Sequence, residues 1–169
     1  MDSDNRELYN AYDKNWQRVY FDEMSQGFVV AHRKHGRDEL PQNVEVAIRL
    51  AKHFGECIEL LPSVNIHQVK SADSTRNGEI WEWKTTNGTT TSVQKRLRTA
   101  STQANYILLI LPPVFDESVV LRGIMSAVNC DKIGRILKID LLLEKDKLVR
   151  LSREQIRKRE FSDFYNALK

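Results

Sequence analysis

The hydrophobic and polar positions along the chain predict strands and helices in an α/β order. Short runs rich in β-branched and aromatic residues favour strands, and the alternation after Gly78 favours another. The run from Tyr106 to Leu111 is apolar at every position, which is typical of a strand that is buried on both faces of a sheet. Strands are predicted at residues 19–21, 28–31, 56–61, 79–84, 106–111, 135–143 and 147–151.

Helical periodicity separates these strands, and the pattern predicts helices at residues 41–54, 92–103, 116–129 and 152–168. The first has Pro41 in its first turn and Gly55 at its C-terminal cap, with an inward stripe of Val44, Ala47, Ile48 and Ala51. Ser92, Asp116 and Ser152 are the predicted N-caps of the other three. The fold class is therefore α/β, with a central mixed β-sheet flanked by helices.

The length of 169 residues suits one domain with a sizeable core. We expect a polar N-terminal segment over residues 1–15, either a short helix or a linker, and a single domain over residues 16–169. The first 25 residues do not resemble a signal peptide, and no run approaches the roughly 20 apolar residues of a membrane span. A net charge of +3 leaves room for a polyanionic partner and gives no reason to expect a membrane.

Residues 73–84 contain the chemistry that is most informative about function. Asn77 and Gly78 predict a tight turn, and the strand after it carries Glu82 and Lys84 on one face. A turn of this kind can bring the Asp73 carboxylate beside Glu82. Two hard oxygen donors next to an ammonium group suit a Mg²⁺ site with a cationic neighbour.

Two basic surfaces accompany this segment. The loop that follows the second predicted strand contains His32, His35 and Arg37, and the helix after Lys84 carries Gln94, Lys95 and Arg98 on its polar face. Solvated surface residues are one interpretation of each set, and contacts with substrate phosphates are the other.

Asp73, followed after eight residues by the triplet Glu82-Trp83-Lys84, resembles the PD-(D/E)xK nuclease core, the restriction-endonuclease-like fold. Ala72 stands where the proline of that motif would be. The resemblance implies that Asp73, Glu82 and the Trp83 carbonyl bind Mg²⁺ or Mn²⁺, and that Lys84 positions or activates the attacking water. It further implies a third acid on the first core helix, here Glu45, and substrate contacts from Gln94 and Lys95. The predicted order from residue 41 to residue 111 (helix, strand, a turn with Asp73, the strand with Glu82 and Lys84, helix, apolar strand) resembles the order of the family's core.

Four segments show a narrower resemblance. Residues 26–30 (Gln-Gly-Phe-Val-Val), 59–62, 77–84 and 92–98 resemble the C-terminal toxin domain of contact-dependent growth-inhibition proteins, which also occurs on phage and mobile-element proteins. That resemblance implies a tRNA nuclease and a cognate immunity protein. It also implies a domain that is delivered as part of a larger protein and acts in the cytoplasm.

The expected activity is metal-dependent hydrolysis of phosphodiester bonds, with RNA, and tRNA in particular, as the substrate. Two alternatives stay open. The same fold could cleave DNA, or the chain could be a non-catalytic module that binds nucleic acid or protein, in which the acids are structural.

Overall fold

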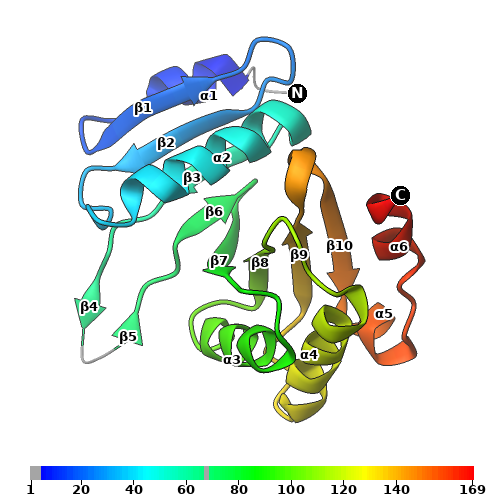
Figure 1. Ribbon diagram of the computed structural model, residues 1–169. Coiled ribbons are helices and arrows are strands. Elements are labelled where there is room, and N and C mark those ends of the chain that lie inside the picture. Colours follow the sequence, from blue (N-terminus) through cyan, green and yellow to red (C-terminus); the bar gives the residue numbers. More distant parts are fainter. Residues whose placement is uncertain (1–4, 67–68) are drawn as a thin grey trace. The chain divides into compact units, whose positions relative to one another are not determined.

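The computed structural model describes residues 5–66 and 69–169 (Figure 1). The chain divides into two compact units, Met1–Ile80 and Trp81–Lys169, and each is described by itself. Both contain strands in parallel and antiparallel pairs together with helices, so the predicted α/β class with mixed strand pairing is confirmed. The expectation of one domain over residues 16–169 stays a prediction.

The first unit is built on four strands in the order β1-β2-β3-β6. β1 and β2 pair antiparallel, β2 and β3 pair parallel through the crossover helix α2, and β3 and β6 pair antiparallel. The strands β4 and β5 form a separate two-stranded ladder. The elements are α1 (Asn5–Ala11), β1 (Trp16–Phe21), β2 (Phe28–His32), α2 (Leu40–Phe54), β3 (Cys57–Leu60), β4 (Asn65–Ile66), β5 (Val69–Lys70) and β6 (Ser74–Arg76).

The ends of α2 are as predicted, and its buried face is as predicted in part. Pro41 lies in the first turn, and Gly55 ends the helix in the left-handed region with its N–H on the Ala51 carbonyl. The buried residues are Val46, Ala47, Leu50 and Ala51, whereas the predicted Val44 and Ile48 are only half-buried. The Ala51 end of this face lies close to Gly27, where a Cβ would be 2.2 Å from the Ala51 carbonyl oxygen.

Residues 5–11, which belong to the polar segment that preceded the predicted domain, form the helix α1. The Tyr9 ring lies 5.4 Å from the Phe21 ring and 5.6 Å from the Phe28 ring. Helix α1 therefore packs onto β1 and β2 as part of the first unit.

The second unit contains three parallel strands and one antiparallel strand in the order β7-β8-β9-β10. The first two residues of β7, Glu79 and Ile80, are the last two residues of the first unit, and the rest of the strand belongs to the second. The elements are β7 (Glu79–Thr85), α3 (Thr90–Ala100), β8 (Tyr106–Ile110), α4 (Glu117–Cys130), β9 (Lys138–Leu142), the 3₁₀ turn η1 (Glu144–Asp146), β10 (Leu148–Ser152), α5 (Arg153–Lys158) and α6 (Ser162–Leu168). The predicted elements from α2 to β8 occur in the predicted order, and the short strands β4, β5 and β6 lie between β3 and β7 in addition.

One face of these strands is covered by α3 and α4. Ile107 and Leu109 of β8 align with Ile139 and Leu141 of β9, and all four are fully buried against the two helices. The helices contribute Val93, Leu97 and Ala100 from α3, and Val120, Leu121, Ile124, Ala127 and Val128 from α4. A β7 side chain on this face is therefore surrounded by apolar residues of the sheet and of α3 and α4.

Of the three N-caps predicted for helices in this unit, two are confirmed and one is wrong. The N-cap of α3 is Thr89, whose hydroxyl accepts the Ser92 N–H, so the prediction that Ser92 caps the helix is wrong. Asp116 caps α4 as predicted, and Ser152 forms the predicted capping box with Gln155. The predicted C-terminal helix is broken in two, because Arg159 adopts a left-handed conformation (φ 60°) that ends α5. No helix in residues 5–66 and 69–169 is long and apolar enough to cross a membrane.

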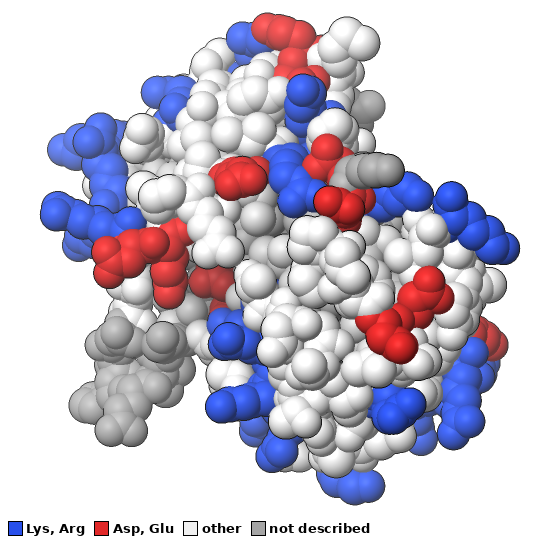
Figure 2. Space-filling model, viewed as in Figure 1, with Lys and Arg blue, Asp and Glu red and all other residues white. Residues whose placement is uncertain are grey.

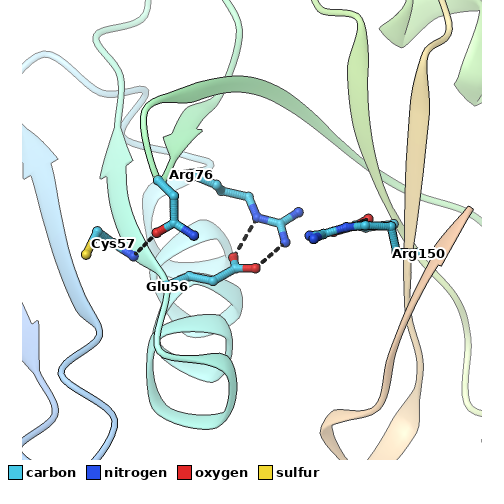
Figure 3. A network of polar contacts seen from close by, with 6 residues as sticks. Glu56, Cys57, Arg76 and Arg150 are labelled. Carbon is cyan, nitrogen blue, oxygen red and sulfur yellow. Dashed lines mark hydrogen bonds and ion pairs between the residues drawn. The ribbon is translucent and has the colours of Figure 1, made fainter. Parts of the chain in front are cut away.

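A buried ion pair anchors β6 in the first unit (Figure 3). The Arg76 guanidinium donates through Nε and Nη2 to the two carboxylate oxygens of Glu56, both at 2.7 Å. The side chains are 2% and 7% exposed, so the bidentate pair forms away from water.

We expect Arg76→Met to lower the free energy of unfolding by roughly 3–5 kcal/mol, because it removes the guanidinium from a buried carboxylate. Urea unfolding followed by circular dichroism measures this. Lys158→Met, which breaks an exposed pair with Glu154, is the control and should leave stability unchanged. Equal effects of the two substitutions would contradict the role of burial.

A second anchor, in the other unit, depends on pH. Burial raises the pKa of the Asp131 carboxyl, but backbone N–H groups of Ile136 and Arg135 and the Arg153 guanidinium outweigh burial and hold that pKa below its ordinary value of 3.8. Arg153 donates to the Asp131 carboxylate at 2.7 Å. A carboxyl group with a lowered folded-state pKa stabilises the fold above its unfolded pKa and loses this contribution as pH falls through the folded pKa.

Asp131→Asn should therefore destabilise the protein at pH 7, and the difference from the unsubstituted protein should shrink steadily below about pH 4. Thermal unfolding of both proteins between pH 7 and pH 3 tests this. A difference that is constant over that range would show that the ionised carboxylate is not the stabilising group.

Candidate functional site

A tight turn at Asn77 and Gly78 precedes β7, the strand that carries Glu82 and Lys84. Asn77 and Gly78 have φ angles of 49° and 82°, and two consecutive positive values are typical of a two-residue hairpin turn. The Asn77 carboxamide oxygen also accepts the Cys57 N–H at 2.8 Å, which ties the turn to the start of β3. The predicted turn is confirmed.

Glu82 is the central group of the candidate site in the second unit. It aligns with Ile107 and Ile139, so its side chain lies on the face covered by α3 and α4 and is 1% exposed. Its Oε1 accepts a hydrogen bond from Gln103 Nε2 at 2.8 Å and is in close contact with the Lys84 ammonium. Burying a carboxylate is costly unless charged or polar groups meet it, and these two side chains do so.

Lys84 lies on the same face of β7, as predicted, with a side chain that is 20% exposed. It therefore stands between the buried carboxylate and solvent. Trp81 and Trp83 point to the other face and are 1% and 5% exposed. Trp83, whose carbonyl is a predicted metal ligand, lies between Glu82 and Lys84 in the sequence of β7.

Asp73 lies in the first unit, immediately before β6. Its carbonyl accepts the Leu61 N–H at 2.9 Å, and its side chain is half-buried. Because side chains alternate along a strand, the Asp73 side chain shares a face with Thr75. Glu45 lies in α2 with an exposed side chain.

The basic loop contains three residues in different surroundings. His32 is half-buried, and its ring lies 5.1 Å from the Trp16 ring. His35 is 6% exposed, with Nδ1 2.6 Å from the Leu61 carbonyl oxygen and Nε2 3.0 Å from the Asn43 amide. Both ring nitrogens of His35 thus bond within the protein, which favours a structural role over the predicted phosphate contact. Arg37 has an exposed side chain.

The polar face of α3 surrounds a surface hollow of about 510 Å³. It is lined by Thr91, Gln94, Lys95, Arg98, Thr99 and Thr102, so three of the six residues predicted for substrate binding, those on α3, lie together. Figure 2 shows Lys and Arg side chains along the margin of the view where α3 and α4 lie in Figure 1. Gln94 Nε2 also lies 3.9 Å from the Sγ of Cys130, an exposed free cysteine at the end of α4.

Gln103 is the residue of the site that sequence reasoning missed. The sequence pattern placed it at the end of a helix, whereas α3 ends at Ala100 and the following turn brings the amide back to β7. No local pattern marks such a contact, because it depends on how the chain reverses after α3. Thr102 lines the hollow, and its neighbour in sequence, Gln103, contacts Glu82. The hollow and the Glu82 site are therefore connected through two consecutive residues.

The donor chemistry of Asp73 and Glu82 fits a hard divalent cation. In the described part of the chain, no three His, Cys, Asp or Glu side chains gather in a group that could hold a metal ion. Mg²⁺ does not require such a group, because it is commonly held by one or two carboxylates with water and substrate phosphates. The buried Glu82 carboxylate is a donor of this type.

We expect Gln103→Leu to lower the free energy of unfolding by about 1–3 kcal/mol, since it removes a hydrogen bond to a buried carboxylate. Gln94→Leu, the matched control on the helix surface, should stay within about 0.5 kcal/mol of the unsubstituted protein. Urea unfolding of both variants measures the difference. Equal stabilities would mean that Gln103 does not support Glu82.

No model of a known protein family matches the sequence, and no curated protein matches it. Among solved structures, the chain is similar to one in the CdiA-CT/CdiI toxin and immunity complex from Burkholderia pseudomallei. The two are 16% identical, the match covers 68% of this chain and 85% of that chain, and the TM-score is 0.49. At this identity and TM-score, the similarity assigns neither an activity nor a site residue to the chain.

Proposed function

We propose that this chain is a toxin-type nuclease domain that hydrolyses phosphodiester bonds in RNA with the help of Mg²⁺ or Mn²⁺. The observation that carries the proposal is the buried Glu82 carboxylate, held by Gln103 and accompanied by Lys84 at the border with solvent. A carboxylate kept buried beside an ammonium group is a costly arrangement, and metal-dependent phosphoryl chemistry uses both groups.

Asp73 is the second metal ligand in this proposal. A two-residue turn at Asn77–Gly78 makes Arg76 and Glu79 the first pair of a hairpin. A turn of this kind can bring the Asp73 carboxylate beside Glu82, which supports the choice of Asp73 as the second ligand. The Trp83 carbonyl, between Glu82 and Lys84, is the proposed third protein ligand.

A divalent ion bound by these groups would supply a Lewis acid that polarises the phosphate and lowers the pKa of a bound water. The chain's own residues have separate tasks. Gln103 orients the Glu82 carboxylate, and Lys84 Nζ donates a hydrogen bond to the attacking water or to a phosphate oxygen as negative charge develops. The apolar face beneath α3 and α4 excludes water from the buried side of Glu82.

Substrate binding is proposed for the hollow on α3. Lys95 and Arg98 supply positive charge for phosphates, while Gln94 and the threonine hydroxyls around them can bond sugar and phosphate oxygens. Exposed Arg37 is a further phosphate contact in the first unit. RNA rather than DNA, and a cognate immunity protein as partner, are proposed on the resemblance of the four sequence segments.

The test incubates the purified protein with total tRNA and with plasmid DNA, in Mg²⁺ and in EDTA. We expect tRNA cleavage in Mg²⁺ only, and a loss of at least about a hundredfold in Asp73→Ala and in Glu82→Ala. Glu79→Ala, on the exposed start of the same strand, is the matched control and should cleave normally. Glu45→Ala tests the proposed third acid, and normal cleavage would return Glu45 to the role of a helix-surface residue.

Other outcomes select between the alternatives. Cleavage of DNA alone would establish the DNA endonuclease. Binding of either nucleic acid without cleavage would support a non-catalytic binding module. Cleavage that persists in EDTA or in Asp73→Ala would refute the proposed metal site.

A further inference from the structure

A hydrogen-bonded chain of side chains connects the N-terminal helix to the strand that follows Asp73. It begins with Arg18 of β1, which holds the end of α1 by donating to the carbonyls of Tyr9, at 3.0 Å, and Tyr12, at 2.9 Å. The Tyr12 ring is held by edge contacts with Trp16, at 5.5 Å, and Phe28, at 5.9 Å. Both the backbone and the ring of Tyr12 are therefore fixed.

The Tyr12 hydroxyl points at Glu59 of β3. It donates to Glu59 Oε1 at 2.7 Å, while the Thr75 hydroxyl of β6 donates to Glu59 Oε2. Burial, and then the Glu59 carboxylate, raise the pKa of Tyr12 above its ordinary value of 10.0, so the phenol keeps its proton and remains a donor at neutral pH. Glu59 is thus held between Tyr12, the residue that follows α1, and Thr75 of β6, with both carboxylate oxygens in use.

The register of β3 and β6 connects this clamp to Asp73. Glu59 lies directly opposite Thr75, and the Leu61 N–H bonds the Asp73 carbonyl one hydrogen-bonded pair further along. Thr75 is two residues from Asp73, so Glu59, Thr75 and Asp73 share one face of these strands. β6 is only three residues long, which leaves few backbone bonds to fix its position.

We infer that Tyr12 and Glu59 are positioning residues of the candidate site, which hold β6 through Thr75 and thereby present the Asp73 carboxylate. The inference rests on the proposed function, because it gives Asp73 a task that requires a fixed position. Groups that orient metal ligands commonly contribute tenfold to a hundredfold in metal affinity. One of the two orienting residues, Tyr12, comes from the N-terminal segment that the sequence pattern had set apart from the domain.

The experiment measures Mn²⁺ affinity by calorimetry, at a temperature well below unfolding, for Tyr12→Phe, Thr75→Val and Thr75→Ser. Tyr12→Phe keeps the ring between Trp16 and Phe28 and removes only the hydroxyl. We expect Tyr12→Phe and Thr75→Val to bind Mn²⁺ about tenfold more weakly. Thr75→Ser, which keeps the hydroxyl, should restore most of the affinity. The matched control is Tyr9→Phe, which removes a hydroxyl from the other tyrosine on Phe28 and should bind normally.

Asp73→Ala distinguishes the positioning role of Tyr12 and Glu59 from the proposed metal site itself. If it loses Mn²⁺ binding while Tyr12→Phe and Thr75→Val bind normally, the positioning role is refuted and the proposed metal site stands. If Asp73→Ala binds Mn²⁺ like the unsubstituted protein, both are refuted. Equal weakening in Tyr9→Phe and Tyr12→Phe would show general loosening of α1 and would also overturn the positioning role.

Discussion

The requirement that a carboxylate removed from water must meet a cation or a donor shapes both units. Glu56, Glu82 and Asp140 are all buried, and each is met by a basic side chain. Glu56 and Asp140 pair bidentately with arginines, Arg76 at 2.7 Å and Arg150 at 2.8–2.9 Å. An arginine fork occupies both oxygens and suits a permanent structural pair.

Glu82 differs from the other two in the type of its cation. Lys84 is a compact point charge on a flexible stem, and both Lys84 and Gln103 approach Oε1. The structural pairs thus have rigid, planar partners, whereas the proposed functional acid has an adaptable one. This contrast supports the assignment of chemistry to Glu82 rather than to the other buried acids.

Features that depend on neighbouring residues in sequence could be predicted, and those that depend on packing could not. The Gly55 and Asp116 caps, the Ser152 capping box and the Asn77–Gly78 turn each need only a few adjacent residues. On α2, Ala47 and Ala51 are buried as predicted, but the burial of Val46 and Leu50 instead of Val44 and Ile48 depends on packing against distant parts of the chain. The break at Arg159 was missed because a left-handed arginine has no signature in a helical pattern.

In the candidate site, the alternation of side chains along β7 correctly predicted that Glu82 and Lys84 share one face. The contacts of Gln103, Tyr12 and the buried His35 could not be predicted, because each joins separate elements of the fold.

The two cysteines differ in a way that is useful for chemistry in solution. Cys130 is exposed beside Gln94 at the rim of the hollow, whereas Cys57 is half-buried in β3, where burial and then Glu56 and Glu59 raise the pKa of its thiol. Alkylating reagents reach the exposed Cys130 directly, whereas burial and the raised pKa slow the reaction of Cys57, so Cys130 is the faster to react. A maleimide fluorophore can therefore be attached at Cys130 in the natural sequence, where its emission would report directly on the occupancy of the adjoining hollow.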